Sequence, residues 1–248
     1  MLIKFICCDV FARIACDLVA RSPHIVDVEF LPMMAHVEPD KLRQTISERI
    51  LDSVDGSARN YDALILGFGL CGNATIGLTC PIPMVIPRAH DCCTVFMGSK
   101  SRFLEAFGDS LSARWCSTGY WERAFTRNSG YPAFDQPNNY KTSEQYMAFL
   151  EEYDEETAEY LWQTMHPSIE MKTAFYIRQD GFEYSAAQDG FKSLMDRDGV
   201  ELQTVDGSTS LLEALVFGEW DNERFLVVPP GKRIVGVYDM DSVVKAED

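Results

Sequence analysis

The 248-residue sequence lacks several features that would place it in a familiar class of protein. No apolar run approaches the roughly 18 residues of a membrane-spanning helix, and Lys4 and Asp9 interrupt the apolar N-terminus before a signal-peptide core is complete. Basic residues are few: 22 Lys and Arg stand against 38 Asp and Glu, a net charge of −16. This charge disfavours nucleic acid and anionic membranes as partners. We therefore expect a cytoplasmic protein.

Cysteine usage excludes two further classes. Secreted disulfide scaffolds are typically shorter than ~100 residues and dense in cysteine, whereas this chain has eight cysteines in 248 residues. It also contains no CxxC pair, which excludes a zinc finger built from local ligand pairs. We expect the thiols to be reduced and available as metal ligands or nucleophiles.

The first ninety residues alternate between strand-like and helix-like segments. Strands are expected at residues 3–8, 26–31, 63–66 and 84–86. Apolar residues at four-residue spacing predict a helix after Asp9, which can cap it, and a second helix from Pro39 to Val54. Strands alternating with helices in this way are typical of a parallel sheet.

The C-terminal part repeats the theme, with expected strands at residues 173–177, 200–205 and 224–228. The sequence therefore predicts a doubly wound, mostly parallel α/β fold with two pseudo-duplicated, Rossmann-like halves. We divide it into an N-terminal half at 1–114, a connecting segment at 115–170 and a C-terminal half at 171–248.

The connecting segment has two parts. Residues 115–140 are dense in aromatics, Gly, Pro and Asn, and they are expected to form a loop that is either a lid or a packed linker. One acidic helix then carries an apolar face from Met147 to Leu161. Residues 134–170 hold nine acidic residues and one basic residue, which favours a solvated surface for this helix.

Ligands of open parallel sheets bind at the carboxyl ends of the strands, and here each of the first four strands is followed by a thiol or an imidazole. Cysteine and histidine together suit zinc, and also iron or an iron–sulfur cluster. Each residue alone could equally be a packed core residue. The residues at these strand ends are Cys7, Cys8, His36, Cys71, His90, Cys92 and Cys93.

A glycine loop follows the third strand. Gly67, Gly69 and Gly72 match the letters of a dinucleotide-binding pattern, and Asn73 adds a polar group to the loop. Only about eight residues separate Gly72 from Pro81, which leaves little room for the helix on which a pyrophosphate rests. The glycines are therefore either cofactor-binding or required for a sharp turn and a close approach to a ligand.

Two charged residues follow the fourth strand. Arg88 could clamp a substrate carboxylate or phosphate, or form a structural ion pair. Asp91 could orient His90 or a metal-bound water. We name Arg88 and Asp91 as the candidate catalytic residues.

Three strings carry a resemblance to a known family: Leu66-Gly-Phe-Gly-Leu-Cys-Gly-Asn, Val85-Ile-Pro-Arg-Ala-His-Asp-Cys and Phe225-Leu-Val-Val-Pro-Pro-Gly. They resemble an uncharacterised domain family of methanogens and anaerobic bacteria, whose members commonly carry Gly-Tyr-Gly-Leu-Cys-Gly-Asn and Pro-Arg-x-His-Asp-Cys. Phe68 departs from that pattern, which has tyrosine there. The family often stands beside corrinoid-dependent methyltransferase systems, so the resemblance implies methyl-group or one-carbon metabolism. Carried over by motif position, it points to Cys8, His36, Cys71, His90 and Cys92, which we name as the candidate metal ligands. The ion would be held by Cys8, Cys71, Cys92 and either His36 or His90.

These observations lead to one main hypothesis and two alternatives. The main hypothesis is a metal-dependent enzyme of methyl-group or one-carbon transfer that acts on a small molecule or a corrinoid protein. The chain has no Asp-x-His-x-x-Gly frame, so we do not expect it to be the corrinoid carrier itself. The alternatives are a protein that binds, delivers or senses a metal or cofactor, and an NAD-dependent oxidoreductase.

Overall fold

The structure is a computed structural model that describes residues 1–33, 39–54, 59–108, 114–125, 144–165, 173–237 and 242–248. Among these residues no helix is both long enough and apolar enough to cross a membrane.

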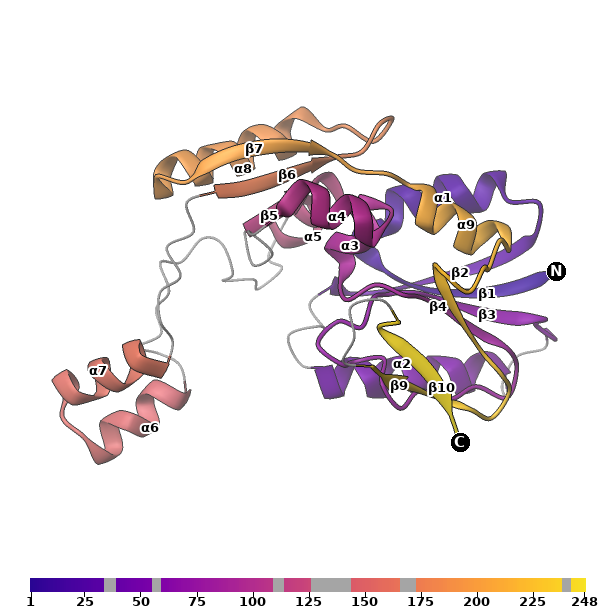
Figure 1. Cartoon of the computed structure of the whole chain (residues 1–248), viewed down its shortest axis with the longest axis horizontal. Helices are drawn as coiled ribbons and strands as arrows, with labels where there is room; N and C mark the ends of the chain where they lie inside the picture. The colour runs from indigo at the N-terminus through magenta and orange to yellow at the C-terminus, as the bar shows by residue number, and fades with distance from the viewer. Residues whose placement is uncertain (34–38, 55–58, 109–113, 126–143, 166–172, 238–241) are drawn as a thin grey trace.

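A five-stranded sheet, sheet A, forms the larger part of the molecule (Figure 1). Its order is β2-β1-β3-β4-β8, with four parallel strands and β8 antiparallel to β4. The strands are β1 (Leu2–Cys8), β2 (Ile25–Leu31), β3 (Ala63–Gly67), β4 (Met84–Pro87) and β8 (Phe225–Val228). Every residue of β3 and β4 is buried, as expected for central strands that are covered on both faces.

Helices cover both faces of sheet A. Helices α1 (Ala12–Arg21) and α9 (Ser210–Phe217) lie on one face and α2 (Pro39–Val54) lies on the other (Figure 1). Successive side chains of a strand point to opposite faces, and accordingly Phe5 belongs to the core beside α1 and Ile6 to the core beside α2. The predicted Rossmann-like α/β class with a mostly parallel sheet is confirmed.

A second, three-stranded parallel sheet has the order β5-β6-β7. Its strands are β5 (Arg114–Ser117), β6 (Thr173–Arg178) and β7 (Glu201–Asp206), and α8 (Ser185–Asp198) packs on them. Phe96 joins the two sheets because its ring contacts Phe11 on the side of sheet A (4.6 Å between centroids) and Trp115 on the side of the second sheet (5.9 Å). One apolar core therefore runs from sheet A to the second sheet.

The remaining elements connect or extend these sheets. They are the short helix η1 (Asp9–Phe11), the helices α3 (Cys92–Met97), α4 (Lys100–Phe107), α5 (Thr118–Phe125), α6 (Glu144–Glu152) and α7 (Glu155–Met165), and the hairpin of β9 (Arg233–Gly236) and β10 (Val244–Glu247).

The last expected strand of the C-terminal half has a different partner from the one we expected. β8 pairs with β4 at the edge of sheet A instead of extending the second sheet. Its four-residue apolar run is compatible with either sheet, and pairing is decided by contacts between residues far apart in sequence. The proposed division at residues 114 and 170 stays a prediction.

The connecting segment also differs from expectation. The start of the expected loop forms β5 and α5, while residues 126–143 lie outside the described residues. The expected single acidic helix is two helices, α6 and α7, which pack through Tyr146 and Trp162. The break occurs because Asp154 Oδ1 accepts a 2.8 Å hydrogen bond from Thr157 N–H and so caps a new helix.

Candidate functional site

The order of the strands in sheet A defines a place where a ligand can bind. After β1 the chain crosses one face through α1 to reach β2, and after β2 it crosses the other face through α2 to reach β3. Phe11, after β1, packs in the core beside α1, whereas Phe68 and Leu78, after β3, pack in the core beside α2, so the segments that follow these adjacent strands lie on opposite faces of sheet A. In open α/β sheets such a switch point is the usual site of ligand binding.

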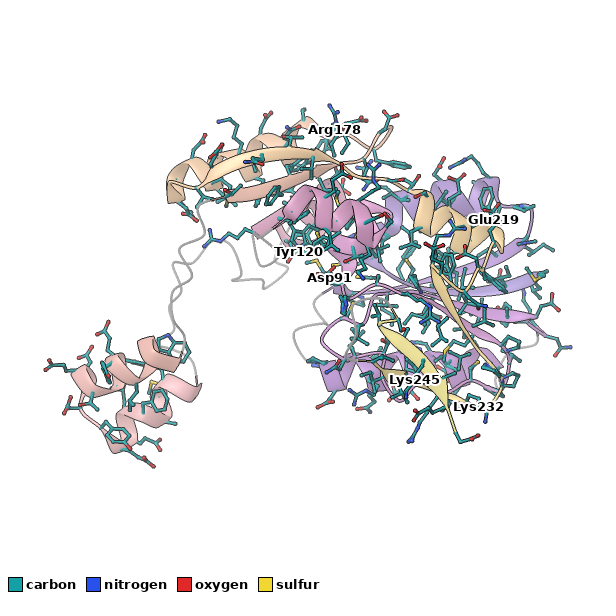
Figure 2. All side chains as sticks on the ribbon, viewed as in Figure 1. Asp91, Tyr120, Arg178, Glu219, Lys232 and Lys245 are labelled. Carbon is teal, nitrogen blue, oxygen red and sulfur yellow. The ribbon has the colours of Figure 1, made fainter. Side chains whose placement is uncertain are left out.

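A pocket of about 340 Å³ lies at this switch point, a volume suited to a small molecule. We call it the thiol pocket. Every parallel strand of sheet A contributes to it through the loop at its carboxyl end, and β5 and α5 close it from the second sheet. Its lining residues are Cys8, Phe11, Pro32, Met33, Leu42, Phe68, Cys71, Gly72, Asp91, Cys92, Trp115 and Tyr120. Figure 2 shows Asp91 and Tyr120 in the region between the two sheets.

Three of the predicted metal ligands, Cys8, Cys71 and Cys92, line the thiol pocket, and the structure distinguishes two of them from the adjacent cysteine. Cys8 is half-buried and lines the pocket, whereas Cys7 is buried in the apolar core. Cys92 is half-buried and lines the pocket, whereas Cys93 is buried in the same core. For the strand pair the reason is the alternation of side chains along β1.

Cys71 is presented by a strained turn. Cys71, Gly72 and Asn73 all have positive φ angles, of 47°, 65° and 73°. Residues other than glycine seldom adopt this conformation, which costs of order 1 kcal/mol or more for each residue. Such strain is concentrated at functional sites, and here it places a thiol at the switch point.

The loops after β3 and β4 are held against each other by their backbones. Leu70 N–H donates to the carbonyl of Ala89 (2.8 Å), and Cys71 N–H donates to the carbonyl of His90 (3.0 Å). A Cβ atom on Gly69 would lie 2.8 Å from Asp91 N and 2.9 Å from Ala89 O. Glycine is therefore required at position 69 for this close approach.

The environment of the thiols favours their neutral form. Burial raises the pKa of Cys71 to about 12 and, as the largest cause, raises the pKa of Cys8 and of Cys92 well above the ordinary value. Repulsion from the other thiolates adds to the increase for Cys8 and Cys92. Without a cation beside them these three side chains remain thiols at neutral pH, and thiols are poor nucleophiles.

Asp91 contributes a carboxylate to the thiol pocket. Its Oδ1 atom accepts hydrogen bonds from Thr94 N–H (2.8 Å) and Thr94 Oγ (2.9 Å), so it caps α3. Among the described residues no hydrogen bond reaches its Oδ2 atom and no cation pairs with it. Asp91 thus both fixes the helix that carries Cys92 and brings a negative charge to the pocket.

Of the two predicted histidine ligands, one can be placed. His36 lies outside the described residues. His90 does not line the pocket, although its buried Nε2 atom has no hydrogen-bond partner in the described part of the chain.

Arg88 does not act as the expected substrate clamp in the pocket, because its side chain extends to a different part of the molecule. Its guanidinium donates to the carbonyl oxygens of Asn222 (2.9 Å), Phe225 (3.2 Å), Ser242 (2.6 Å) and Val244 (2.5 Å). These contacts fasten β8 and β10 to the end of β4, and Arg88 does not line the thiol pocket. One residue beyond β4, the direction of a long side chain is set by tertiary contacts that the sequence pattern does not specify.

The glycine loop has the turn conformation, without a following helix. Residues 71–77 form turns, so the loop lacks the helix N-terminus on which the pyrophosphate of a dinucleotide rests. A Cβ atom on Gly67 would lie 2.5 Å from Cys7 Sγ, which ties this glycine to the packing of β1 against β3. Asn73 is exposed and its carbonyl accepts from Arg43 (3.0 Å). Of the four predicted cofactor-binding residues, Gly72 lines the pocket.

Asp9 has a different role from the expected helix cap. Its Oδ1 atom accepts a 2.8 Å hydrogen bond from Met33 N–H, which joins the loop after β1 to the loop after β2. Its other oxygen lies 3.6 Å from Arg123 Nε. The short helix η1, which separates Asp9 from α1, makes this geometry possible.

Sequence reasoning missed the aromatic side of the pocket. Phe11, Phe68, Trp115 and Tyr120 all line it, and they come from η1, the loop after β3, β5 and α5. The density of aromatic residues after residue 114 was the available signal. It did not show that this segment folds back onto the carboxyl ends of sheet A.

No three or more His, Cys, Asp or Glu side chains in the described ranges are arranged to hold a metal ion as they stand. The donor chemistry nevertheless suits a soft or borderline metal, because three thiols from three separate loops face one pocket.

Comparison with known proteins gives a family and no activity. No curated protein and no solved structure matches the chain. A family model described as a protein of unknown function, DUF1638, matches residues 30–216, which include three of the four loops at the strand ends. The resemblance to an uncharacterised conserved domain is thereby confirmed, and the chain belongs to the DUF1638 family.

Proposed function

We propose that the thiol pocket binds a soft metal ion, zinc or iron, and transfers a methyl or other one-carbon group to or from a small molecule or a corrinoid protein. The observation that carries the proposal is the meeting of Cys8, Cys71 and Cys92 in one pocket of about 340 Å³. Cys8 ends β1, Cys71 lies in the loop after β3 and Cys92 begins α3 after β4. The methyl group as cargo comes from the family resemblance and not from the geometry.

The state of the thiols supports a metal. Burial keeps the pKa of Cys71 at about 12, so the pocket by itself supplies little thiolate at neutral pH. A bound zinc or iron ion would replace the thiol protons and hold thiolates that are good nucleophiles. The ligands would be Cys8, Cys71 and Cys92, together with a donor such as His36, which lies outside the described residues.

The residues of the pocket have other tasks in this proposal. The apolar side chains of Phe11, Phe68 and Met33 limit the contact of the half-buried thiols with water. The carboxylate of Asp91 orients whatever binds beside Cys92.

A second function, delivery or sensing of the metal, is favoured by one observation. Cys8, Cys71 and Cys92 are half-buried, so a metal bound by them stays within reach of solvent and of an acceptor. Measurements of metal exchange and of methyl transfer therefore distinguish the two functions.

The test begins with anaerobic purification and elemental analysis for zinc and iron. We expect about one metal ion per chain, and at least a tenfold lower metal affinity in each of Cys8→Ser, Cys71→Ser and Cys92→Ser. Cys16→Ser is the matched control because Cys16 is exposed on α1, outside the thiol pocket. Circular dichroism verifies that each variant keeps its fold.

The outcomes are distinct. Equal metal affinity in the Cys71→Ser and Cys16→Ser variants would overturn the metal site. Methyl transfer that requires Cys71 supports the enzyme, whereas rapid loss of the metal to a chelator with no transfer supports delivery.

A further inference from the structure

We propose that the thiol pocket selects a compact methylated ammonium ion, which is held against aromatic rings and beside the carboxylate of Asp91. The inference rests on the proposed function only in taking the thiol pocket as the substrate site. It names the chemical class of the substrate, which neither the family match nor the sequence patterns supply.

Aromatic side chains form a large part of the pocket wall. Phe11, Phe68, Trp115 and Tyr120 line it and come from four different elements. Trp115 is the most exposed of the four, since Phe11 and Phe68 are buried and Tyr120 is 9% exposed. Trp115 and Tyr120 are packed edge to face, with centroids 5.0 Å apart and an interplanar angle of 61°. Aromatic rings that line a small pocket attract quaternary ammonium groups through the negative charge on their faces.

The charge in the pocket has the sign that a cation requires. Asp91 is the one residue with a formal charge among the described lining residues. Its Oδ1 atom is engaged by Thr94, and its Oδ2 atom receives no hydrogen bond from the described residues. Arg123 is near Cys8 but is opposed by Asp9, with 3.6 Å between its Nε and the carboxylate.

The described lining contains no lysine or arginine that would recognise a carboxylate or phosphate. This observation separates a cationic ligand from an anionic one. A net charge of −16 on the chain also favours the approach of cations over anions.

We infer methylation of the ammonium from the few oxygen acceptors among the described lining side chains, which are the Asp91 carboxylate and the Tyr120 hydroxyl. A primary ammonium has three N–H donors, and moving it from water into an apolar pocket is costly unless each of them finds a partner. A quaternary ammonium has no N–H donor, so it loses no hydrogen bond on entry and presents methyl groups to the aromatic rings. Its methyl groups would also lie near the thiols of Cys8, Cys71 and Cys92, which line the same pocket.

The experiment compares choline with 3,3-dimethyl-1-butanol, which has the same shape without the charge. Binding to the full chain is measured by calorimetry at constant ionic strength, in the metal-free and the zinc-loaded protein, with tetramethylammonium as a second cationic probe. We expect choline and tetramethylammonium to bind at least tenfold more tightly than the neutral alcohol. Equal binding of choline and the alcohol, or no binding of either cation, would overturn the proposal.

Two variants assign the binding to this pocket. Asp91→Asn removes the charge while asparagine still caps α3, and Trp115→Leu removes one ring. We expect each to weaken choline binding at least fivefold. Trp220→Phe is the matched control because the Trp220 indole donates to the carbonyl of Leu215 (2.8 Å) and does not line the pocket. An equal loss of affinity in Trp220→Phe and Trp115→Leu would contradict the assignment.

The failure of this inference can be distinguished from failure of the proposed function. If zinc binds through the thiols and neither cation binds, the inference of a methylated ammonium substrate is wrong and the proposed metal site stands. If choline binding depends on Asp91 and the protein has no affinity for zinc or iron, the proposed metal site is wrong and the cation site stands.

Discussion

The backbone N–H of Cys71 donates a 3.0 Å hydrogen bond to the carbonyl oxygen of His90. This bond joins the segments after β3 and β4 beyond the ends of both strands. Cys71 lies in the first segment, and the second leads to Cys92 at the start of α3. The backbone thus fixes where the two thiols originate, while their side chains remain able to approach a ligand.

The close contact of these loops can be tested at Gly69. We expect Gly69→Ala to lower the free energy of unfolding by about 1–3 kcal/mol, because the added Cβ would lie 2.8 Å from Asp91 N. Urea denaturation measures the change. Gly77→Ala is the control in the same loop: its φ is +84° but no atom lies within 4 Å of the added Cβ, so it bears only the backbone cost of about 1 kcal/mol. We also expect Gly69→Ala, and not Gly77→Ala, to weaken metal binding. The reverse order of effects would contradict the role of Gly69.

The burial of the thiols predicts a dependence of stability on pH. The unfolded chain ionises the Cys71 thiol near 9.0, whereas the folded metal-free protein holds the proton up to a pKa of about 12. This stabilisation is complete below pH 9 and is lost as the pH rises toward 12, so the free energy of unfolding decreases over that range. Denaturation measurements between pH 8 and 11 should show that the free energy of unfolding decreases less steeply with pH in Cys71→Ala than in Cys16→Ser. Parallel curves would show that Cys71 is not shielded from water.

Arg88 should contribute to stability and not to metal binding. Its guanidinium is hydrogen-bonded to four carbonyl oxygens, two in the segment 222–225 and two in the segment 242–244. We expect Arg88→Met to cost about 1.5–3 kcal/mol and to increase hydrogen exchange in β8 and β10, with unchanged metal affinity. Arg178→Met, which removes an exposed ion pair with Asp206, should cost less than about 1 kcal/mol. Loss of metal affinity in Arg88→Met with stability retained would contradict this structural role.

The break between α6 and α7 depends on Asp154. The pKa of Asp154 is lowered because its carboxylate accepts from Thr157 N–H, so its contribution is present above its ordinary value of 3.8 and is lost as the pH falls through the lowered pKa. We expect Asp154→Ala to reduce protection of the first turn of α7 from hydrogen exchange at neutral pH, and this difference from the wild type to disappear in acid. Glu156→Ala serves as the control within the same turn. A difference that persists in acid would point to a cause other than the charged cap.

The sequence by itself determined most of the elements of the fold and the placement of chemistry along it. The expected strands at 3–8, 63–66 and 84–86 coincide with β1, β3 and β4 because burial on both faces of a sheet requires an apolar run, and that requirement is local. The topology of parallel strands then brings the residues after them to one edge of the sheet. This topology predicts that thiols after β1, β3 and β4 meet at one edge, whereas the choice of Cys8 over Cys7 and of Cys92 over Cys93 came from the family resemblance.

Only the tertiary structure decided which partners distant segments take. It placed β8 beside β4, directed Arg88 to the carbonyls around β8 and β10, and brought Trp115 and Tyr120 from the second sheet over the thiols. It also separated Cys92 from Cys93. Local periodicity determines whether a residue is in a strand or a helix, but the pairing of edges and the direction of long side chains depend on packing between segments that the chain brings together only when it folds.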